Sequence, residues 1–117
     1  MLLTDYLDAA AGQYPGKTLL IHGDRKFTYG EINAAACGIA AGLLESGLEP
    51  GFRGALLTDD PFCYITSYFG IQLAGGVVVG LNTQTSAAGL AYVLEDCQAS
   101  VLIAAEKFNR YIQDALP

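Results

Sequence analysis

Two glycine-containing stretches have compositions that could bind a phosphate group. The first is LAGGVVVGLN, Leu73 to Asn82. A phosphate cradle needs free backbone N–H groups at the N-terminus of a helix, usually just after a strand. Gly75 and Gly76 instead follow an expected helix and precede an expected strand, where the helix dipole is negative, and the dinucleotide pattern G-x-G-x-x-G does not occur. The stretch therefore predicts a helix end that leads into a buried strand.

The second stretch is Gly16-Lys17-Thr18, which has the composition of the end of a nucleotide P-loop. The pattern G-x-x-x-x-G-K-[ST] requires glycine at position 11, where this chain has Ala11. The element order is also inverted, because a helix is expected before the stretch and a strand after it. We therefore predict that this stretch is not a P-loop.

Adjacent carboxylates occur twice and could act as an acid–base pair. Asp59 and Asp60 follow an expected parallel strand, at the end where α/β folds bind ligands, and they are the best physical candidate for a site. The alternative, which we favour, is that Asp60 caps the next helix, with Pro61 at its first position. Glu95 and Asp96 diverge on a helix and lie at its C-terminal end, so we expect solvated side chains there.

Histidine and cysteine offer little further chemistry. His22 is the only histidine, lies near an expected turn and has no G-x-S-x-G partner motif, so we predict a surface or strand-end residue. The three cysteines, Cys37, Cys63 and Cys97, are odd in number and form no C-x-x-C pair. They lie in apolar, helix-like contexts, which predicts reduced core residues.

The length, charge and composition of the chain limit the classes of protein to which it can belong. The chain has 117 residues, which suits one domain, and its net charge of −6 argues against a nucleic-acid partner. No apolar run reaches the ~18 residues of a membrane-spanning helix, and the start MLLTDYLDAA lacks the basic region of a signal peptide. We therefore expect a cytoplasmic protein without a membrane span. Hydrophobic residues make up 52%, so we expect some apolar surface to lack cover within so small a chain.

The first third of the chain predicts a helix, a hairpin and a longer helix. Residues 2–11 have apolar spacing on one helical face, with Leu2, Leu3, Tyr6 and Leu7 together, before Gly12, Pro15 and Gly16 end the helix. Strands over 18–22 and 26–29 flank the turn residues Gly23 and Asp24. Thr28 and Glu31 have capping-box spacing, so a helix is expected to follow to about Ser46. Its inward stripe comprises Ile32, Ala36, Ile39, Ala40, Leu43 and Leu44.

The rest of the chain predicts strands that alternate with helices. The expected segments are the strand RGALLTD, the helix FCYITSYFGIQLA, the buried strand VVVGLN, a helix capped by Ser86, the buried strand SVLIAA and the final helix EKFNRYIQDALP. Short strands separated by helices need crossover connections, so the sheet should be largely parallel. The predicted fold class is α/β, a three-layer Rossmann-like unit with a largely parallel sheet and an N-terminal hairpin.

The ordered segments resemble the beginning of the AMP-forming acyl-CoA synthetase family, whose superfamily also holds peptide-synthetase adenylation domains and luciferases. Residues 28–32, TYGEI, are similar to the family's early T-Y-x-E-L motif, and residues 73–82 are similar to its later K-A-G-A-V-x-V-P-L-N motif. The similarity covers nearly the whole chain in family order and spacing. Two departures are Gly80, where the family usually has proline, and GFRG at 51–54 in place of G-D-R-V.

The resemblance implies an enzyme that activates a carboxylate with ATP to an acyl-adenylate and then transfers the acyl group to a thiol. The family's Ser/Thr/Gly-rich phosphate loop, its acidic nucleotide-binding motifs and its catalytic lysine lie downstream of the segments matched here. The resemblance therefore carries no catalytic, cofactor-binding or metal-binding residue onto this chain. It implies ATP, Mg²⁺ and coenzyme A for the full-length family member and none of them for this chain. Asn82, where peptide-synthetase domains more often have Asp, favours the acyl-CoA synthetases.

We therefore expect residues 1–117 to be an N-terminal subdomain fragment of an acyl-CoA synthetase-like protein, catalytically incompetent alone. Its expected partners are the missing downstream part of the enzyme and, through exposed apolar surface, further copies of itself. Two alternatives stay open. One is a stand-alone self-associating module, and the other is a small nucleotide-binding protein that uses the strand ends near Thr58, Asp59 and Asn82.

Overall fold

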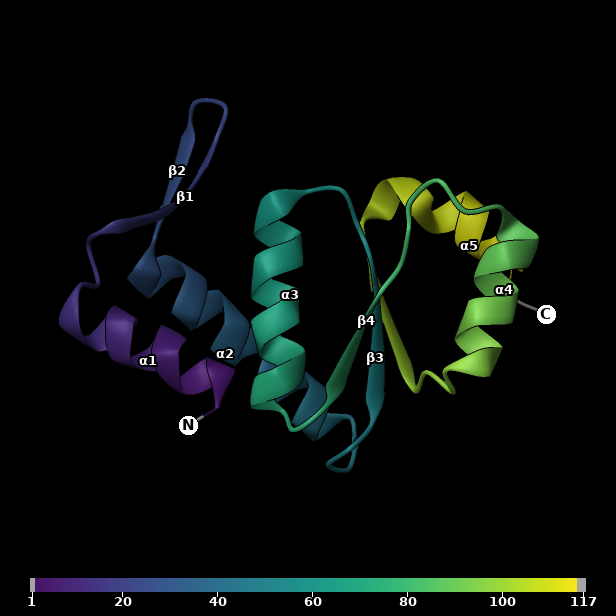
Figure 1. The fold of residues 1–117 in the computed structure, drawn as a ribbon, viewed down its shortest axis with the longest axis horizontal. Coiled ribbons are helices and arrows are strands. Elements are labelled where there is room, and N and C mark those ends of the chain that lie inside the picture. The colour runs from purple at the N-terminus through teal and green to yellow at the C-terminus, as the bar shows by residue number, and fades with distance from the viewer. Residues whose placement is uncertain (1, 116–117) are drawn as a thin grey trace.

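The computed structural model describes residues 2–115 (Figure 1). Along the chain the elements are α1 (Leu3–Gln13), β1 (Thr18–His22), β2 (Arg25–Thr28), α2 (Tyr29–Glu45), β3 (Arg53–Leu57), α3 (Pro61–Leu73), β4 (Val77–Gly80), α4 (Ala87–Asp96), β5 (Val101–Ala104), the 3₁₀ turn η1 (Glu106–Phe108) and α5 (Asn109–Ala115). The expected final helix is therefore divided into η1 and α5, and its last two residues, 116 and 117, lie outside the described range.

The strands form two separate sheets. The larger has the order β4-β3-β5 and is parallel throughout, with Gly54 of β3 opposite Val78 on one side and Val101 on the other. Strands β1 and β2 form an antiparallel hairpin, in which His22 lies opposite Arg25 beside the turn. The predicted α/β class, with its parallel sheet and N-terminal hairpin, is confirmed.

Helices cover both faces of the parallel sheet (Figure 1). On one face, Ala40 and Leu43 of α2 pack with Phe52 and with Ile71 of α3. On the other face, Leu90 of α4 and Ala115 of α5 form a core cluster with Leu57. A third cluster joins Leu7, Phe27 and Ile32 and attaches α1 and the hairpin to the body. These three layers are the expected arrangement for parallel strands with crossover helices.

Side-chain caps begin three of the helices where the sequence predicts them. The Thr28 hydroxyl accepts the Glu31 N–H at 3.1 Å, and the Glu31 carboxylate accepts the Thr28 N–H at 3.0 Å, so the capping box before α2 is complete. Asp60 caps α3 and Ser86 caps α4 by accepting the N–H of the third helical residue, at 2.9 and 3.1 Å. Each cap satisfies a backbone donor that the helix leaves free.

Close packing between α2 and α3 depends on Gly70. A Cβ at this position would lie 2.7 Å from Cγ2 of Ile39 and 3.1 Å from the carbonyl oxygen of Ala36. Since the second of these atoms is backbone, it cannot rotate away. Gly70 therefore lets the two helices that cover the sheet approach each other closely.

Strands β4 and β5 are less buried than the sequence predicts. Both segments are predicted to be buried strands, yet the four β5 residues are all half-buried and Val77 of β4 is 52% exposed. By contrast, β3, the central strand, is buried from Gly54 to Leu57. The reason is topological, because β4 and β5 are the two edges of a sheet that has three strands in the described residues.

Three further expectations about burial are wrong in part. Of the apolar residues predicted to share one face of the first helix, Leu7 is buried, whereas Leu2, Leu3 and Tyr6 are exposed. Leu44, predicted in the inward stripe of α2, is half-exposed, because α2 packs through the residues before it. The cysteines are free thiols, but Cys37 is exposed on α2 and the other two are only half-buried, so none is a core residue.

None of the helices within residues 2–115 combines the length and the apolar character that crossing a membrane requires.

Candidate functional site

An open depression lies at the carboxyl end of the parallel sheet, where α/β folds bind ligands. Its volume is about 520 Å³, and it is lined by His22, Asp59, Asp60, Ala105 and Lys107. The residues come from the hairpin, from the segment after β3 and from the segment after β5. The Asp59–Asp60 pair, the best site candidate from residue types, thus lies in this depression with three residues that no sequence motif associates with it, namely His22, Ala105 and Lys107.

Asp59 is paired with a lysine from a distant part of the chain. The Lys107 ammonium donates a hydrogen bond to Oδ2 of Asp59. This hydrogen bond is the main reason why the pKa of the Asp59 carboxyl lies below its usual value of 3.8. A carboxylate that is ion-paired with a lysine is a poor general base, because the pairing lowers its affinity for a proton.

The main structural role of Asp60 is to cap the N-terminus of α3. Its Oδ2 accepts the Cys63 N–H at 2.9 Å, and its own N–H donates to Oγ1 of Thr58 at 3.1 Å. The favoured interpretation of Asp60 as an N-cap is therefore confirmed. Its second oxygen, Oδ1, lies 4.0 Å from Nδ1 of His22. His22 is a strand-end residue with a half-exposed side chain, as predicted.

The approach of His22 to Asp60 had no sequence signal. It follows from the stacking of Phe27 on Phe62, with ring centroids 4.4 Å apart, which brings the hairpin to the first turn of α3. Neither aromatic side chain has a spacing that identifies its partner. The contact is a tertiary one that local patterns do not encode.

The residues proposed for a nucleotide site lie in different environments. Thr58 is buried and its hydroxyl is used by Asp60, while Asp59 faces the depression after β3. Asn82 instead lines a separate apolar cavity of about 140 Å³ after β4, and its Oδ1 accepts the Gln84 N–H at 2.9 Å in a local turn. The structure does not bring these three side chains into one site.

The glycine stretches have the structural roles that the sequence predicts. Gly75 has a φ of +88° directly after α3, which is the left-handed backbone of a helix end. Lys17 lies between α1 and β1, with its ammonium 5.5 Å from the centroid of the Tyr14 ring. Glu95 and Asp96 end α4 with exposed side chains.

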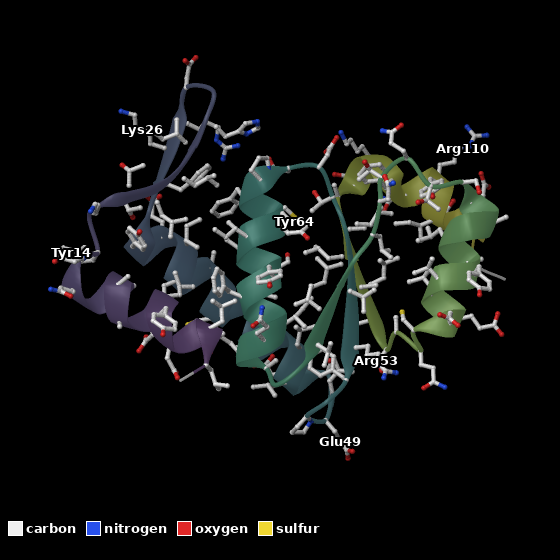
Figure 2. All side chains as sticks on the ribbon, in the orientation of Figure 1. Tyr14, Lys26, Glu49, Arg53, Tyr64 and Arg110 are labelled. Carbon is white, nitrogen blue, oxygen red and sulfur yellow. The ribbon has the colours of Figure 1, made fainter. Side chains whose placement is uncertain are left out.

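The cations are dispersed and most have structural partners. Arg53 donates to the carbonyl oxygen of Cys97 at 3.2 Å, at the end of α4, and Arg25 lies over the Phe27 ring at 4.8 Å. Figure 2 shows Lys26 on the hairpin, Arg53 at the start of β3 and Arg110 on α5, in separate parts of the molecule. Because phosphate transfer needs several cations and N–H groups around one position, these residues do not fit a triphosphate.

Metal-binding residues are similarly scattered. Within residues 2–115, no three His, Cys, Asp or Glu side chains lie close enough together to hold a metal ion. The described part of the chain therefore does not fit Mg²⁺ bound by protein side chains alone.

The fold defines an α/β protein with a small parallel sheet, and comparison with known proteins identifies the family. The profile described as "AMP-binding enzyme" matches residues 7–116. The chain therefore belongs to the AMP-binding enzyme family. The resemblance stated from the two sequence motifs is confirmed.

Relatives are several times longer than this chain. The chain is 37% identical over 102 residues to the 3-[(3aS,4S,7aS)-7a-methyl-1,5-dioxo-octahydro-1H-inden-4-yl]propanoyl:CoA ligase of Mycobacterium tuberculosis (strain ATCC 25618 / H37Rv), which aligns 87% of this chain with 20% of that ligase. It thus spans about a fifth of the length of that relative.

Solved structures also align nearly all of this chain with only a part of a longer protein. The anthranilate CoA ligase AuaEII in complex with anthranoyl-AMP superposes with a TM-score of 0.88 at 33% identity, over 94% of this chain and 21% of that one. The inhibitor-bound N-terminal domain of FACL13 from Mycobacterium tuberculosis superposes with a TM-score of 0.87 at 26% identity, over 94% of this chain and 28% of that domain.

Proposed function

We propose that residues 1–117 form the N-terminal structural part of an ATP-dependent acid–CoA ligase. The observation that carries the proposal is the combination of a family match over nearly the whole chain with an alignment to only about a fifth of a CoA ligase. The likeness to the N-terminal domain of FACL13 supports the position within the longer protein.

The activity belongs to the whole protein in this proposal. The complete ligase converts a carboxylic acid with ATP and Mg²⁺ to an acyl-adenylate and then forms the thioester with coenzyme A. The chemistry of the depression supports this division, because Asp59 is paired with Lys107 and Asp60 caps α3. Lys107, the cation that lines the depression, already donates to Asp59 and is not free to stabilise a leaving pyrophosphate, so we assign this chain the role of packed α/β framework.

The relatives do not identify one carboxylic acid substrate, because their names give different substrates. One is a ligase for a ring-bearing propanoyl group, one is a long-chain-fatty-acid–CoA ligase of Bacillus subtilis, and one binds anthranoyl-AMP. We propose a carboxylic acid as the substrate class and the cytoplasm as the location, and fatty acid metabolism as one setting consistent with the Bacillus relative.

An exchange assay tests the inactivity of the isolated chain. Residues 1–117 are incubated with ATP, Mg²⁺, radioactive pyrophosphate and a set of carboxylic acids, with complete AuaEII and anthranilate as the positive control. We expect exchange with AuaEII and none above the protein-free blank with residues 1–117. Exchange by the isolated chain would contradict the proposal, because it would require a phosphate site within this chain.

A second candidate property is self-association of the isolated chain, and exposed apolar side chains favour it. Within residues 2–115, the exposed large apolar side chains are Leu2, Leu3, Tyr6, Tyr14, Ile21, Leu44, Tyr64, Val77 and Tyr92. Such surface promotes association when nothing covers it. We expect light scattering at micromolar concentration to give a dimer or larger species for residues 1–117, and a monomer mass would contradict this candidate.

A further inference from the structure

Strand β5 forms an open edge of the parallel sheet within residues 2–115. Its neighbour on the other side is β3, and the N–H of Ser100 begins this pairing by donating to the carbonyl oxygen of Arg53 at 2.9 Å. Because a parallel ladder uses every second residue of a strand, the backbone N–H and C=O groups of Val101 and Ile103 are directed away from β3. The edge thus presents backbone donors and acceptors to a further strand.

The side chains of β5 also indicate a further neighbour. The strand is Val-Leu-Ile-Ala, without a charge or a proline, and all of its residues are half-buried. Edge strands are normally protected by charged residues, by proline or by a covering element. An open hollow of about 160 Å³ lies beside the start of the strand, lined by Leu94, Ala99, Ser100, Val101 and Leu102. This hollow leaves room for apolar side chains of an adjoining element.

Strand β4 is the other edge and is also apolar, so composition does not decide where the sheet continues. Its sequence is Val-Val-Val-Gly. The N–H groups of Val77 and Leu81 donate to β3 at 2.8 and 2.9 Å, which directs the backbone groups of Val78 and Gly80 outward. The two edges therefore differ in their place along the path of the chain and not in their chemistry.

The helices that connect the strands distinguish the two edges. The β3–α3–β4 connection runs over one face of the sheet, where Ile71 of α3 packs in the cluster that contains Ile103. The β4–α4–β5 connection runs over the opposite face (Figure 1), where Leu90 of α4 packs in the cluster that contains Leu102, and it passes β3 to reach the other edge. Two crossovers that move in opposite directions on opposite faces have the same hand, and parallel crossovers are right-handed in about 98% of cases.

The segment after β5 lies on the same face as α4. Phe108, Tyr111 and Ile112, from η1 and α5, pack in the cluster of Leu90. A right-handed crossover on this face moves in the direction from β4 to β5. The next parallel strand therefore lies beyond β5, since a return to the β4 edge on this face would require a left-handed crossover.

We propose that the β5 edge is completed by a parallel strand that the ligase polypeptide supplies shortly after residue 117. The sheet order then continues from β4-β3-β5 to the new strand. This inference rests on the proposed function, because the downstream chain is that of a ligase such as the relative from Mycobacterium tuberculosis, of which only 20% aligns with this chain. The polypeptide leaves α5 on the correct face of the sheet, which favours a strand of the same chain over a second copy of residues 1–117.

Amide hydrogen exchange tests the proposal by comparing residues 1–117 with a chain lengthened by about 30 residues of the natural coding sequence, the size of one β–α–β unit. In the longer chain, we expect the amides of Val101 and Ile103 to become about tenfold or more protected, because they gain acceptors on the added strand. The outward amides of Val78 and Gly80 in β4 are the matched control, and their protection should not change.

Two proline variants of the longer chain compare the edges directly. Ile103→Pro removes an outward donor of β5, so it should abolish the added protection of Val101. Val78→Pro removes the corresponding donor of β4 and should leave that protection intact. The comparison of the two wild-type chains decides the proposal even where a proline variant fails to fold.

Three results would overturn the proposal. Added protection at β4 instead of β5, or at neither edge, would do so and leave the proposed ligase function intact. Protection of β5 that grows with protein concentration in residues 1–117 alone would assign the edge to a second copy. A stop codon directly after Pro117 would overturn the added strand and the proposed function together, so the two failures are distinguishable.

Discussion

Strands β3 and β4 have similar apolar sequences and very different environments. In β3, Leu56 and Leu57 have no exposed surface, whereas Val77 of the neighbouring strand β4 is 52% exposed. The difference persists at paired positions, because Gly54 and Ala55 of β3 are buried whereas their partners Val78 and Val79 of β4 are half-buried. It arises because β3 has a strand on each side and β4 has a strand on one side only within the described residues.

The exposure of β4 is unusual for a strand of its composition. A continuous run of valines is typical of a parallel strand with cover on both faces, and β4 lacks part of that cover. We infer that the sequence of β4 suits a larger protein than residues 1–117. This agrees with the coverage of about a fifth of the relative from Mycobacterium tuberculosis.

The largest contrast should come from replacing one apolar side chain of each strand with alanine. Leu56→Ala in β3 should lower the free energy of unfolding by about 2–5 kcal/mol, because it removes a fully buried side chain and leaves a cavity. Val77→Ala in β4 should cost well under about 1 kcal/mol, since half of its side chain is already in solvent. Urea denaturation followed by circular dichroism measures both. Equal losses would mean that β4 is covered in solution.

A second contrast lies in the helices that cover β3. Gly70→Ala should destabilise the fold by about 1–3 kcal/mol, because the added Cβ meets the backbone of Ala36. Gly42→Ala is the matched control in α2, where the added Cβ meets no atom within 4 Å. It should stabilise the fold by about 0.5–1 kcal/mol through helix propensity. Thermal unfolding of the two variants would contradict this packing if both changes had the same sign.

A third contrast concerns the cap at the sheet's carboxyl edge. Asp60→Ala should cost about 1 kcal/mol, because the Cys63 N–H loses its acceptor at the start of α3. Asp60→Asn should cost a fraction of that amount, since asparagine caps as well as aspartate. Unfolding by urea at pH 7.5 compares the two variants. A loss in Asp60→Asn as large as that in Asp60→Ala would show that the charge, and not the cap, stabilises this edge.

The smallest effect should come from the Asp59–Lys107 pair, which lies at the solvent-exposed rim. The hydrogen bond from Lys107 lowers the pKa of Asp59 below its usual 3.8. The pair therefore stabilises the fold above that pH, and this contribution is lost as the pH falls through the lowered pKa. Lys107→Gln should unfold slightly more easily than wild type at pH 7, and the difference should vanish on acidification. A difference that grows in acid would contradict the sign.

The sequence was sufficient to predict those features that local chemistry determines. The Thr28–Glu31 capping box, the Asp60 cap and the parallel strands all follow from residue types at fixed spacing. The edge position of β4 and the approach of His22 to Asp60 do not, because both depend on which distant elements become neighbours. The pairing of Lys107 with Asp59 spans 48 positions and likewise has no local signal.

The most direct test of the central claim is to determine the coding sequence beyond the codon for Pro117. We predict an uninterrupted reading frame that encodes a Ser/Thr/Gly-rich phosphate loop and the remaining four-fifths of a CoA ligase. This prediction would be contradicted by a stop codon directly after Pro117 in the natural gene. In that case the exposed β4 edge would belong to a protein of 117 residues, and self-association would become the leading account of its apolar surface.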